Sequence, residues 1–393
     1  MSTVRVTYPI TAKVHQVLGD YPEIAKSISI PDSGRSELEI VCLLNNTHYE
    51  SSKKLLKLIN TWLPLSGPIG KAILKTKNSF QRNQRVAELL LFTHLHERYG
   101  DHLEAPESSN APVCPDLIVG TSVGEIRMEL YTPVDFVGLQ LLEEYLKAIL
   151  GYLDLPCGFK LSIHAGPKRE ADDYERNDLF YAYTFPSAEK ELHAWLIEFQ
   201  AKAEAWLSEG RPSSDLVVDG PGGKTEIRVA CEEYNEDSEE REITIHWGTR
   251  STDTQLFFQV GSAEECARSE WGNKIRTKLR RRQCGGETEG LLRLLVVNFS
   301  MADTGWPHFI SEPWFTKRFD EIIRAIVGDG MTYDAVIPAQ IYSKPCFGMP
   351  VVINPRRKAM AEAFIKEAGM DKQCEPPPEQ TSEEIAKELE NML

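Results

Sequence analysis

The stretch Pro115 to Pro133, PDLIVGTSVGEIRMELYTP, decides the fold that the sequence predicts. Its first run, Asp116 to Val119, is apolar after the leading acid and precedes the small segment Thr121 to Gly124, which is typical of a hairpin turn. The second run alternates, so that Glu129 and Tyr131 share one face of a predicted strand. We expect the hairpin to bring Glu129 near Asp116. Two carboxylates brought together form a hard-oxygen site of the kind that Mg²⁺ or Mn²⁺ prefers.

A Pro-Asp pair at a strand start, a short turn and a glutamate in the next strand resemble the PD-(D/E)XK nuclease-like superfamily. That family places a helical glutamate before the Pro-Asp strand, and Glu88 lies in RVAELLLFTHLHERYG, 28 residues before Asp116. The resemblance implies that Asp116 and Glu129 hold the metal and that Glu88 assists them. The family's lysine, two residues after the glutamate, is Tyr131 in this chain. Tyr131 therefore completes the set of expected catalytic residues.

The resemblance implies an α/β fold, with a restriction-endonuclease-like mixed central sheet flanked by helices and an inserted αβ layer. It implies a DNA endonuclease that hydrolyses phosphodiester bonds with Mg²⁺ or Mn²⁺, of the type used in restriction or anti-phage defence. A neutral Tyr131 does not supply the cation that stabilises charge in phosphoryl transfer. Two alternatives follow. Either Arg127 or Lys278 supplies the cation, or the chain is a catalytically inactive nuclease-fold binding or scaffold subunit.

The charge of the chain is unevenly distributed. The 393 residues carry a net charge of −15, which argues against a protein coated for nucleic-acid binding. The segment from Lys274 to Arg282 is an exception, with six positive charges in nine residues. We expect this segment to form a helix that borders the acids and contacts the DNA backbone, although it could also pair with acidic surface elsewhere. The expected nucleic-acid-binding residues are Lys274, Lys278, Arg281, Arg282 and Gln283.

A third interpretation starts from Gly120 to Gly124, GTSVG, which matches G-x-S-x-G. With the preceding DLIV, it resembles the nucleophile turn of patatin-like phospholipases, which would make Ser122 the nucleophile and Asp219 its base. That turn requires a helix directly after the serine, whereas EIRMELY alternates as a strand. No glycine-rich oxyanion loop precedes it either. A serine lipid hydrolase is therefore the second alternative to a nuclease.

The predicted elements suggest five parts. These are an N-terminal segment (1–65), the first part of a nuclease-like core (66–165), an inserted αβ layer (166–265), the second part of the core (266–372), and a linker with a C-terminal helix (373–393). We expect a strand at Leu38 to Leu44, a helix at Ser51 to Leu63 and a turn or linker at Leu65 to Gly70. Lys224 to Glu233 and Glu242 to Trp247 are expected to be paired strands.

The cysteine spacing and the apolar segments indicate in which cellular compartment the protein is found. The eight cysteines contain no CxxC pair, so we expect neither a zinc site nor a disulfide framework. The sequence has no membrane-spanning apolar run, and MSTVRVTYPI has no signal-peptide core. These features predict a cytoplasmic protein without a membrane contact. A protein partner or a homo-oligomer is compatible with the sequence.

Overall fold

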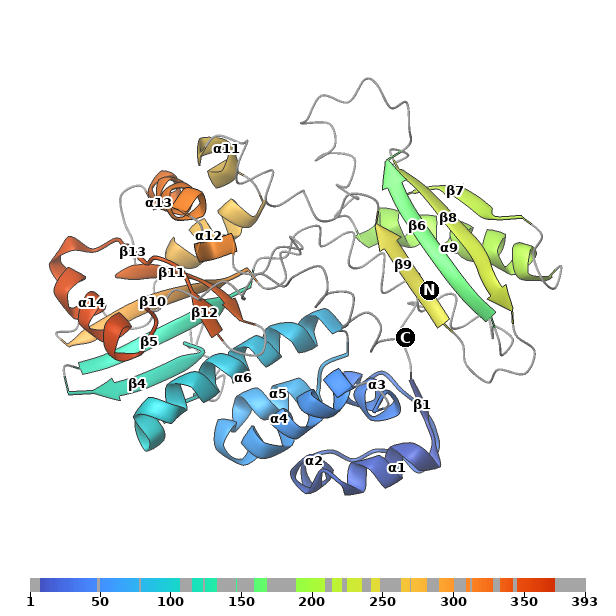
Figure 1. Cartoon of the computed structure of the whole chain (residues 1–393), viewed down its shortest axis with the longest axis horizontal. Helices are drawn as coiled ribbons and strands as arrows, with labels where there is room; N and C mark the ends of the chain where they lie inside the picture. The colour runs from blue at the N-terminus through green and yellow to red at the C-terminus, as the bar shows by residue number, and fades with distance from the viewer. Residues whose placement is uncertain are drawn as a thin grey trace, which may run out of the picture. The chain divides into compact units, whose positions relative to one another are not determined.

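The structure is a computed structural model, shown in Figure 1. The chain divides into two compact units, residues 1–89 with 134–253 and residues 90–133 with 254–393. The residues that the structure describes are 8–47, 50–77, 79–106, 115–122, 124–132, 146, 159–167, 189–208, 214–220, 225–234, 242–247, 263–268, 270–280, 290–299, 309–311, 313–327, 333–341 and 345–371.

The second unit holds the Asp116 hairpin. Its elements are the C-terminal part of α6 (Ser79–Tyr99), η1 (Gly100–His102), β3 (Leu103–Glu104), β4 (Leu117–Thr121), β5 (Gly124–Tyr131), α11 (Ala263–Arg268), α12 (Glu270–Arg280), β10 (Leu291–Asn298), η3 (Phe309–Ser311), α13 (Pro313–Val327), β11 (Ala335–Ile341), β12 (Pro345–Phe347), β13 (Val351–Val352), η4 (Pro355–Arg357) and α14 (Lys358–Glu367). The helix expected around Glu88 and both hairpin strands are thereby confirmed.

The strands of this unit form one mixed sheet in the order β12-β11-β10-β5-β4-β3, with β13 also paired to β11. β10 runs parallel to β5 and to β11, whereas β4 pairs with β5, and β3 with β4, in antiparallel fashion. A strand between two parallel neighbours and under helices is buried on both faces, which explains the apolar run LLRLLVVN of β10. The chain is therefore mixed α/β, with a mixed central sheet flanked by helices.

One face of the sheet is covered by α12 and α13, which Figure 1 shows on the opposite side from α6. Leu295 and Val297 of β10 lie in one buried cluster with Ile275 of α12 and with Phe315 and Phe319 of α13. The apolar stripe of α13 recurs at helical spacing, so burying it fixes the helix on the sheet. This packing also fixes α12 beside the strand that carries Glu129.

The hairpin turn before β5 is closely packed against a distant glycine. Gly124 has φ +138, and a Cβ there would lie 1.9 Å from the carbonyl oxygen of Gly290. The backbone N–H of Glu125 donates to the same oxygen at 2.8 Å. Only glycine fits at position 124, because the backbone conformation and the close approach both exclude a side chain.

The first unit contains a helical segment and a second sheet. The helical segment comprises β1 (Tyr8–Ile10), α1 (Ala12–Gly19), α2 (Pro22–Ser27), β2 (Gly34–Ser36), α3 (Glu39–Asn45), α4 (Glu50–Ser66), α5 (Pro68–Leu74) and the start of α6. The second sheet has the order β7-β8-β6-β9 and comprises β6 (Phe159–Pro167), β7 (Leu216–Asp219), β8 (Thr225–Tyr234) and β9 (Glu242–Trp247), accompanied by α9 (Glu189–Ser208).

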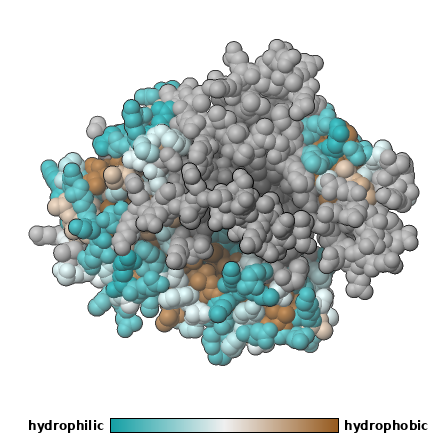
Figure 2. Space-filling view, viewed as in Figure 1, coloured by the Kyte–Doolittle hydropathy of each residue, from teal (hydrophilic) through white to brown (hydrophobic). Residues whose placement is uncertain are grey.

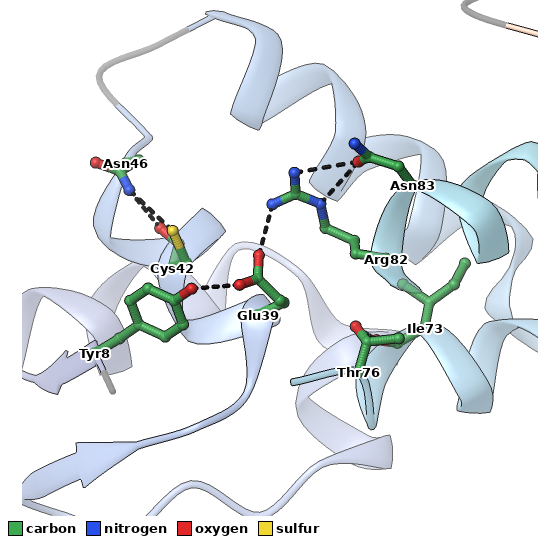
Figure 3. A network of polar contacts seen from close by, with 8 residues as sticks. All are labelled: Tyr8, Glu39, Cys42, Asn46, Ile73, Thr76, Arg82 and Asn83. Carbon is green, nitrogen blue, oxygen red and sulfur yellow. Dashed lines mark hydrogen bonds and ion pairs between the residues drawn. The ribbon is translucent and has the colours of Figure 1, made fainter. Parts of the chain in front are cut away.

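A buried carboxylate ties the helical segment together (Figure 3). Glu39, at the start of α3, is 2% exposed. Its Oε1 accepts a hydrogen bond from the Tyr8 hydroxyl, and its Oε2 lies 2.8 Å from Nη1 of Arg82 in α6. The backbone N–H of Glu39 donates to the carbonyl of Thr76. Three separate segments of chain are thus joined at one charged group.

Several predictions about elements are wrong. Leu38 to Leu44 was expected as a strand but forms α3, whose first-turn N–H is satisfied by Thr76 and not by a capping side chain. Of the turn or linker expected from Leu65 to Gly70, the turn is found at the single residue Gly67, with φ +48, and Pro68 follows at the first position of α5. A proline there is favoured because its missing N–H has no partner in a first helical turn.

The strands β8 and β9 were expected to pair with each other, and this prediction is wrong. β6 lies between them, antiparallel to β8 and parallel to β9. Sequence neighbours suggested a hairpin, but the apolar side chains Leu161 and Ile163 of β6 are fully buried, which suits an inner strand. Cys346 takes part in a disulfide, which the cysteine spacing did not indicate.

The expected C-terminal helix lies outside the described residues. Of the helices that the structure describes, none combines the length and the apolar character needed to cross a bilayer.

Candidate functional site

Asp116 stands directly before β4 and is bonded to the strand that carries Glu129. Its backbone N–H donates to the carbonyl of Met128 at 2.9 Å, and its Oδ2 accepts from the backbone N–H of Leu130 at 2.7 Å. Asp116 therefore contacts the residue before Glu129 and the residue after it. The hairpin thus places Asp116 beside the stretch of β5 backbone that carries Glu129.

Glu129 has a cationic neighbour from a distant part of the chain. Nζ of Lys278, in α12, lies 3.1 Å from Oε2 of Glu129. The Glu129 side chain is 3% exposed, whereas that of Lys278 is 25% exposed. A buried carboxylate normally requires a partner of this kind, because leaving it unpaired costs several kcal/mol. The ammonium group thus balances the charge of the carboxylate, and the Lys278 side chain remains partly exposed.

The other two expected catalytic residues are placed differently. Tyr131 is half-buried and packs against the apolar cluster under α12 and α13. Glu88 belongs to the first unit, where it pairs with Arg85 of the same helix at 2.7 Å. The described contacts join Lys278 to Glu129 and Asp116 to the backbone on either side of Glu129, whereas Glu88 belongs to the other unit.

The basic segment is only partly described. Lys278 is the one expected nucleic-acid-binding residue whose side chain falls in the described part of the chain. Lys274 lies in α12, but its side chain is not described, and Arg281, Arg282 and Gln283 lie outside the described residues. Nη2 of Arg276 donates to the carbonyl of Ala267 at 2.7 Å, so this guanidinium connects α12 to α11.

No cluster of three or more His, Cys, Asp or Glu side chains suited to a metal occurs among the residues that the structure describes. Asp116 and Glu129 provide two carboxylates. Mg²⁺ is often held by one or two carboxylates together with water and substrate phosphates, so a pair of acids fits this cation. The donor set is therefore chemically suitable for Mg²⁺ or Mn²⁺.

The residues of the lipid-hydrolase alternative are not arranged for acyl transfer. Ser122 is an exposed turn residue, and the strand β5 begins two residues later at Gly124. Asp219 lies in the other unit, at the end of β7, where its carbonyl accepts from the Trp195 ring N–H at 2.6 Å. A nucleophile elbow needs a helix after the serine, and the structure has a strand there.

Polar residues at the ends of the parallel strands were missed in the sequence. Nδ2 of Asn298 donates to the Thr132 hydroxyl at 3.2 Å, and its Oδ1 accepts from the N–H of Ile341 at 3.0 Å. Gln340 is fully buried, and its amide has no hydrogen-bond partner in the described part of the chain. Ligands of α/β sheets commonly bind at the carboxyl ends of parallel strands. A polar residue closing an apolar strand, as in VVNF, was the available signal.

Comparisons with models of known protein families, with curated proteins and with solved structures gave no match for this chain.

Proposed function

We propose that this protein is a metal-dependent phosphodiesterase of the PD-(D/E)XK type that acts on DNA. The observation that carries the proposal is the contact between Lys278 and Glu129, 3.1 Å long, beside an aspartate bonded to both neighbours of that glutamate. An ammonium group of α12 contacts a carboxylate of β5, and the aspartate that precedes β4 is bonded to the same stretch of β5. This is the set of charges that phosphodiester hydrolysis uses.

The order of elements supports the same proposal. The helix α6 precedes β3, the Pro-Asp strand β4 and the glutamate strand β5, and α12 then leads into β10, which pairs with β5. The nuclease family likewise runs from its third strand into a helix and then into further strands. The parallel pairing of β5 and β10 places α12 over the sheet, which is why a lysine from this helix reaches the acid.

Asp116 and Glu129 would hold the metal ion, which when bound polarises the scissile phosphate and activates a water molecule. Lys278 takes the role of the motif lysine that Tyr131 has replaced. Its ammonium group lies beside the Glu129 carboxylate. The partial exposure of the Lys278 side chain leaves it accessible to a phosphate oxygen. Tyr131 contributes packing and a hydroxyl donor.

Plasmid cleavage with Mg²⁺, Mn²⁺ or EDTA tests the proposal. Asp116→Ala and Glu129→Ala should each abolish metal-dependent cleavage with the fold retained by circular dichroism, because few protein ligands hold the ion. Glu125→Ala is the matched control, since Glu125 is an exposed acid of the same strand and pairs with Arg127. Cleavage by both site variants at the rate of the unmodified protein would show that the assignment is wrong.

A second candidate function is a nuclease-fold binding or scaffold subunit without catalysis. The observation that favours it is that Lys278 already neutralises Glu129, while Oδ2 of Asp116 accepts a backbone N–H. In that case the unmodified protein binds DNA but leaves it intact under all metal conditions. Tyr131→Lys, which restores the family's lysine, would then be the variant most suited to gain cleavage.

The lipid-hydrolase alternative is tested by Ser122→Ala. Because Ser122 is exposed in a turn, the substitution should change the free energy of unfolding by less than about 0.5 kcal/mol and leave DNA cleavage unchanged. Loss of an esterase activity in this variant would support the patatin-like interpretation.

A further inference from the structure

The helices α4 and α5 carry a concentration of positive charge. Between Ser51 and Ala87 the sequence contains eight lysines and arginines and no aspartate or glutamate. The rest of the chain is strongly acidic, since the whole carries a net charge of −15. The positive charge of this stretch therefore contrasts with the negative charge of the rest of the chain.

Half of these cations have ion-pair partners. Lys53 pairs with Glu50, Lys77 with Glu37, Arg82 with Glu39 and Arg85 with Glu88. The remaining four, Lys54, Lys57, Lys71 and Lys75, are exposed and have no ion pair with any described residue. We call these four residues the α4–α5 lysines.

The two helices hold these lysines on a rigid frame. Leu56, Ile59 and Leu63 form the buried side of α4, and a Cβ at Gly70 of α5 would lie 2.5 Å from Cδ1 of Leu63. This close approach, after the single-residue turn at Gly67, fixes α5 against α4. The burial of the apolar side leaves the lysines on the outer side, and Figure 2 shows hydrophilic residues over these N-terminal helices at the bottom of the view.

The spacing of the lysines suits a row of phosphates. Lys54 and Lys57 are one helical turn apart, with an axial separation of about 4.5 Å, and Lys71 and Lys75 are about 6 Å apart. Phosphates of a DNA strand recur about every 3.4 Å along the helix axis, so neighbouring lysines reach different phosphates. Solubility does not require these cations, because the net negative charge already provides repulsion between molecules.

We propose that the α4–α5 lysines form a second nucleic-acid contact surface, which binds the phosphate backbone without reading sequence. The choice of nucleic acid as the polyanion rests on the proposed function; the presence of an anion-binding surface rests on the lysines alone. The surface lies in the unit that does not contain Asp116 and Glu129. Binding and cleavage are therefore separable properties of the chain.

The test is fluorescence anisotropy of the full chain with labelled duplex DNA of mixed sequence, in EDTA so that no cleavage occurs. The variant carries Lys54→Gln, Lys57→Gln, Lys71→Gln and Lys75→Gln. The matched control carries Lys13→Gln, Lys26→Gln, Lys358→Gln and Lys366→Gln, four exposed lysines on α1, α2 and α14, and has the same net charge.

The slope of log affinity against log salt should become shallower by up to about 3.6 units in the variant, from about 0.9 for each of four lost contacts. Between about 50 and 200 mM salt, the affinity of the unmodified protein should then fall about 150-fold more than that of the variant. The control should keep the unmodified slope.

Three results would overturn the inference: an unchanged slope in the variant, an equal loss in variant and control, or binding of the unmodified protein to phosphatidylserine vesicles but not to DNA. Failure of the proposed function is read separately. If cleavage does not depend on Asp116 while the variant still loses DNA binding, the nuclease assignment fails and the contact surface stands. If cleavage depends on Asp116 while the variant keeps its DNA binding, the contact surface is wrong and the nuclease assignment stands.

Discussion

The ion pair between Lys278 and Glu129 allows a quantitative prediction for Lys278→Met, which keeps an unbranched side chain one atom shorter and removes its charge. Two unit charges 3.1 Å apart attract by about 5 kcal/mol at an effective dielectric constant of about 20. Removing one partner of a buried pair costs about 3–5 kcal/mol, because the other charge stays buried. Lys278 is one quarter exposed, so we expect the low end of this range, about 3 kcal/mol.

The assay is thermal unfolding of the unmodified protein, Lys278→Met, Glu129→Gln and the double variant. For a unit of 150–250 residues, a loss of about 3 kcal/mol lowers the Tm by about 6–12 °C. The double variant should recover to within about 1 kcal/mol of the unmodified protein, because removing both charges also removes the desolvation cost. Purely additive losses would refute the reasoning, since they would show that the two groups do not interact.

The same variants report on metal binding without any cleavage assay. A ligand that binds only the folded state raises the Tm with its concentration. If Glu129 is a metal ligand, Mg²⁺ or Mn²⁺ should raise the Tm of Lys278→Met more than that of the unmodified protein, because the carboxylate no longer has its ammonium partner. Glu129→Gln should show no such increase. An equal response of all three proteins would exclude Glu129 as a ligand.

Arg82→Met should lower the free energy of unfolding by about 3 kcal/mol, because it leaves the buried Glu39 carboxylate without its cation (Figure 3). Urea denaturation measures this free energy. Gly124→Ala should prevent folding or cost more than about 3 kcal/mol, since its Cβ would lie 1.9 Å from the oxygen of Gly290; expression and circular dichroism show the outcome. Burial lowers the pKa of His94, so the unfolded state binds the proton more tightly, and stability should fall as the pH drops below about 6.5. His94→Gln should flatten this part of the Tm profile.

Two matched controls accompany these variants. Arg85→Met removes an arginine whose side chain is 45% exposed and should cost less than about 1 kcal/mol. Gly120→Ala places a Cβ no closer than 3.7 Å to its nearest neighbour, the oxygen of His102, and should be tolerated. If either control is as damaging as its counterpart, the explanation from local geometry is wrong.

The sequence predicted those parts of the fold in which periodicity is strong. The alternation of GEIRMELY predicted β5, because that pattern fits only a strand, and the helix expected around Glu88 is α6. The segment Leu38 to Leu44 was assigned wrongly, because a short apolar run suits a buried strand and a buried helix equally. What decides it is the contact of Glu39 with Arg82 and Thr76, which local sequence does not contain.

The position of Asp116 beside the strand of Glu129 was predictable from the sequence. The partner of Glu129, Lys278, was less predictable. Asp116 and Glu129 are 13 positions apart in one hairpin, so the turn alone places Asp116 beside the strand that carries Glu129. Lys278 is 149 positions from Glu129, and charge density alone made it a candidate among six neighbouring cations. Which of them reaches the acid depends on how α12 packs on the sheet. Asn298 and Thr132 were missed because a single polar residue at a strand end gives no periodic signal.

The parallel pairing of β5 with β10 has a consequence for the order in which the chain folds during synthesis. Asn298 and Thr132, which close this pair, are 166 positions apart. At about 5–20 residues per second, β10 follows β5 from the ribosome after roughly 8–30 s. During that interval the edge of β5 that later receives β10 is unpaired, and such an edge attracts other strands. We therefore expect the yield of folded protein to depend on chaperones that shield this edge, and to be more sensitive to slow translation between β5 and β10 than elsewhere.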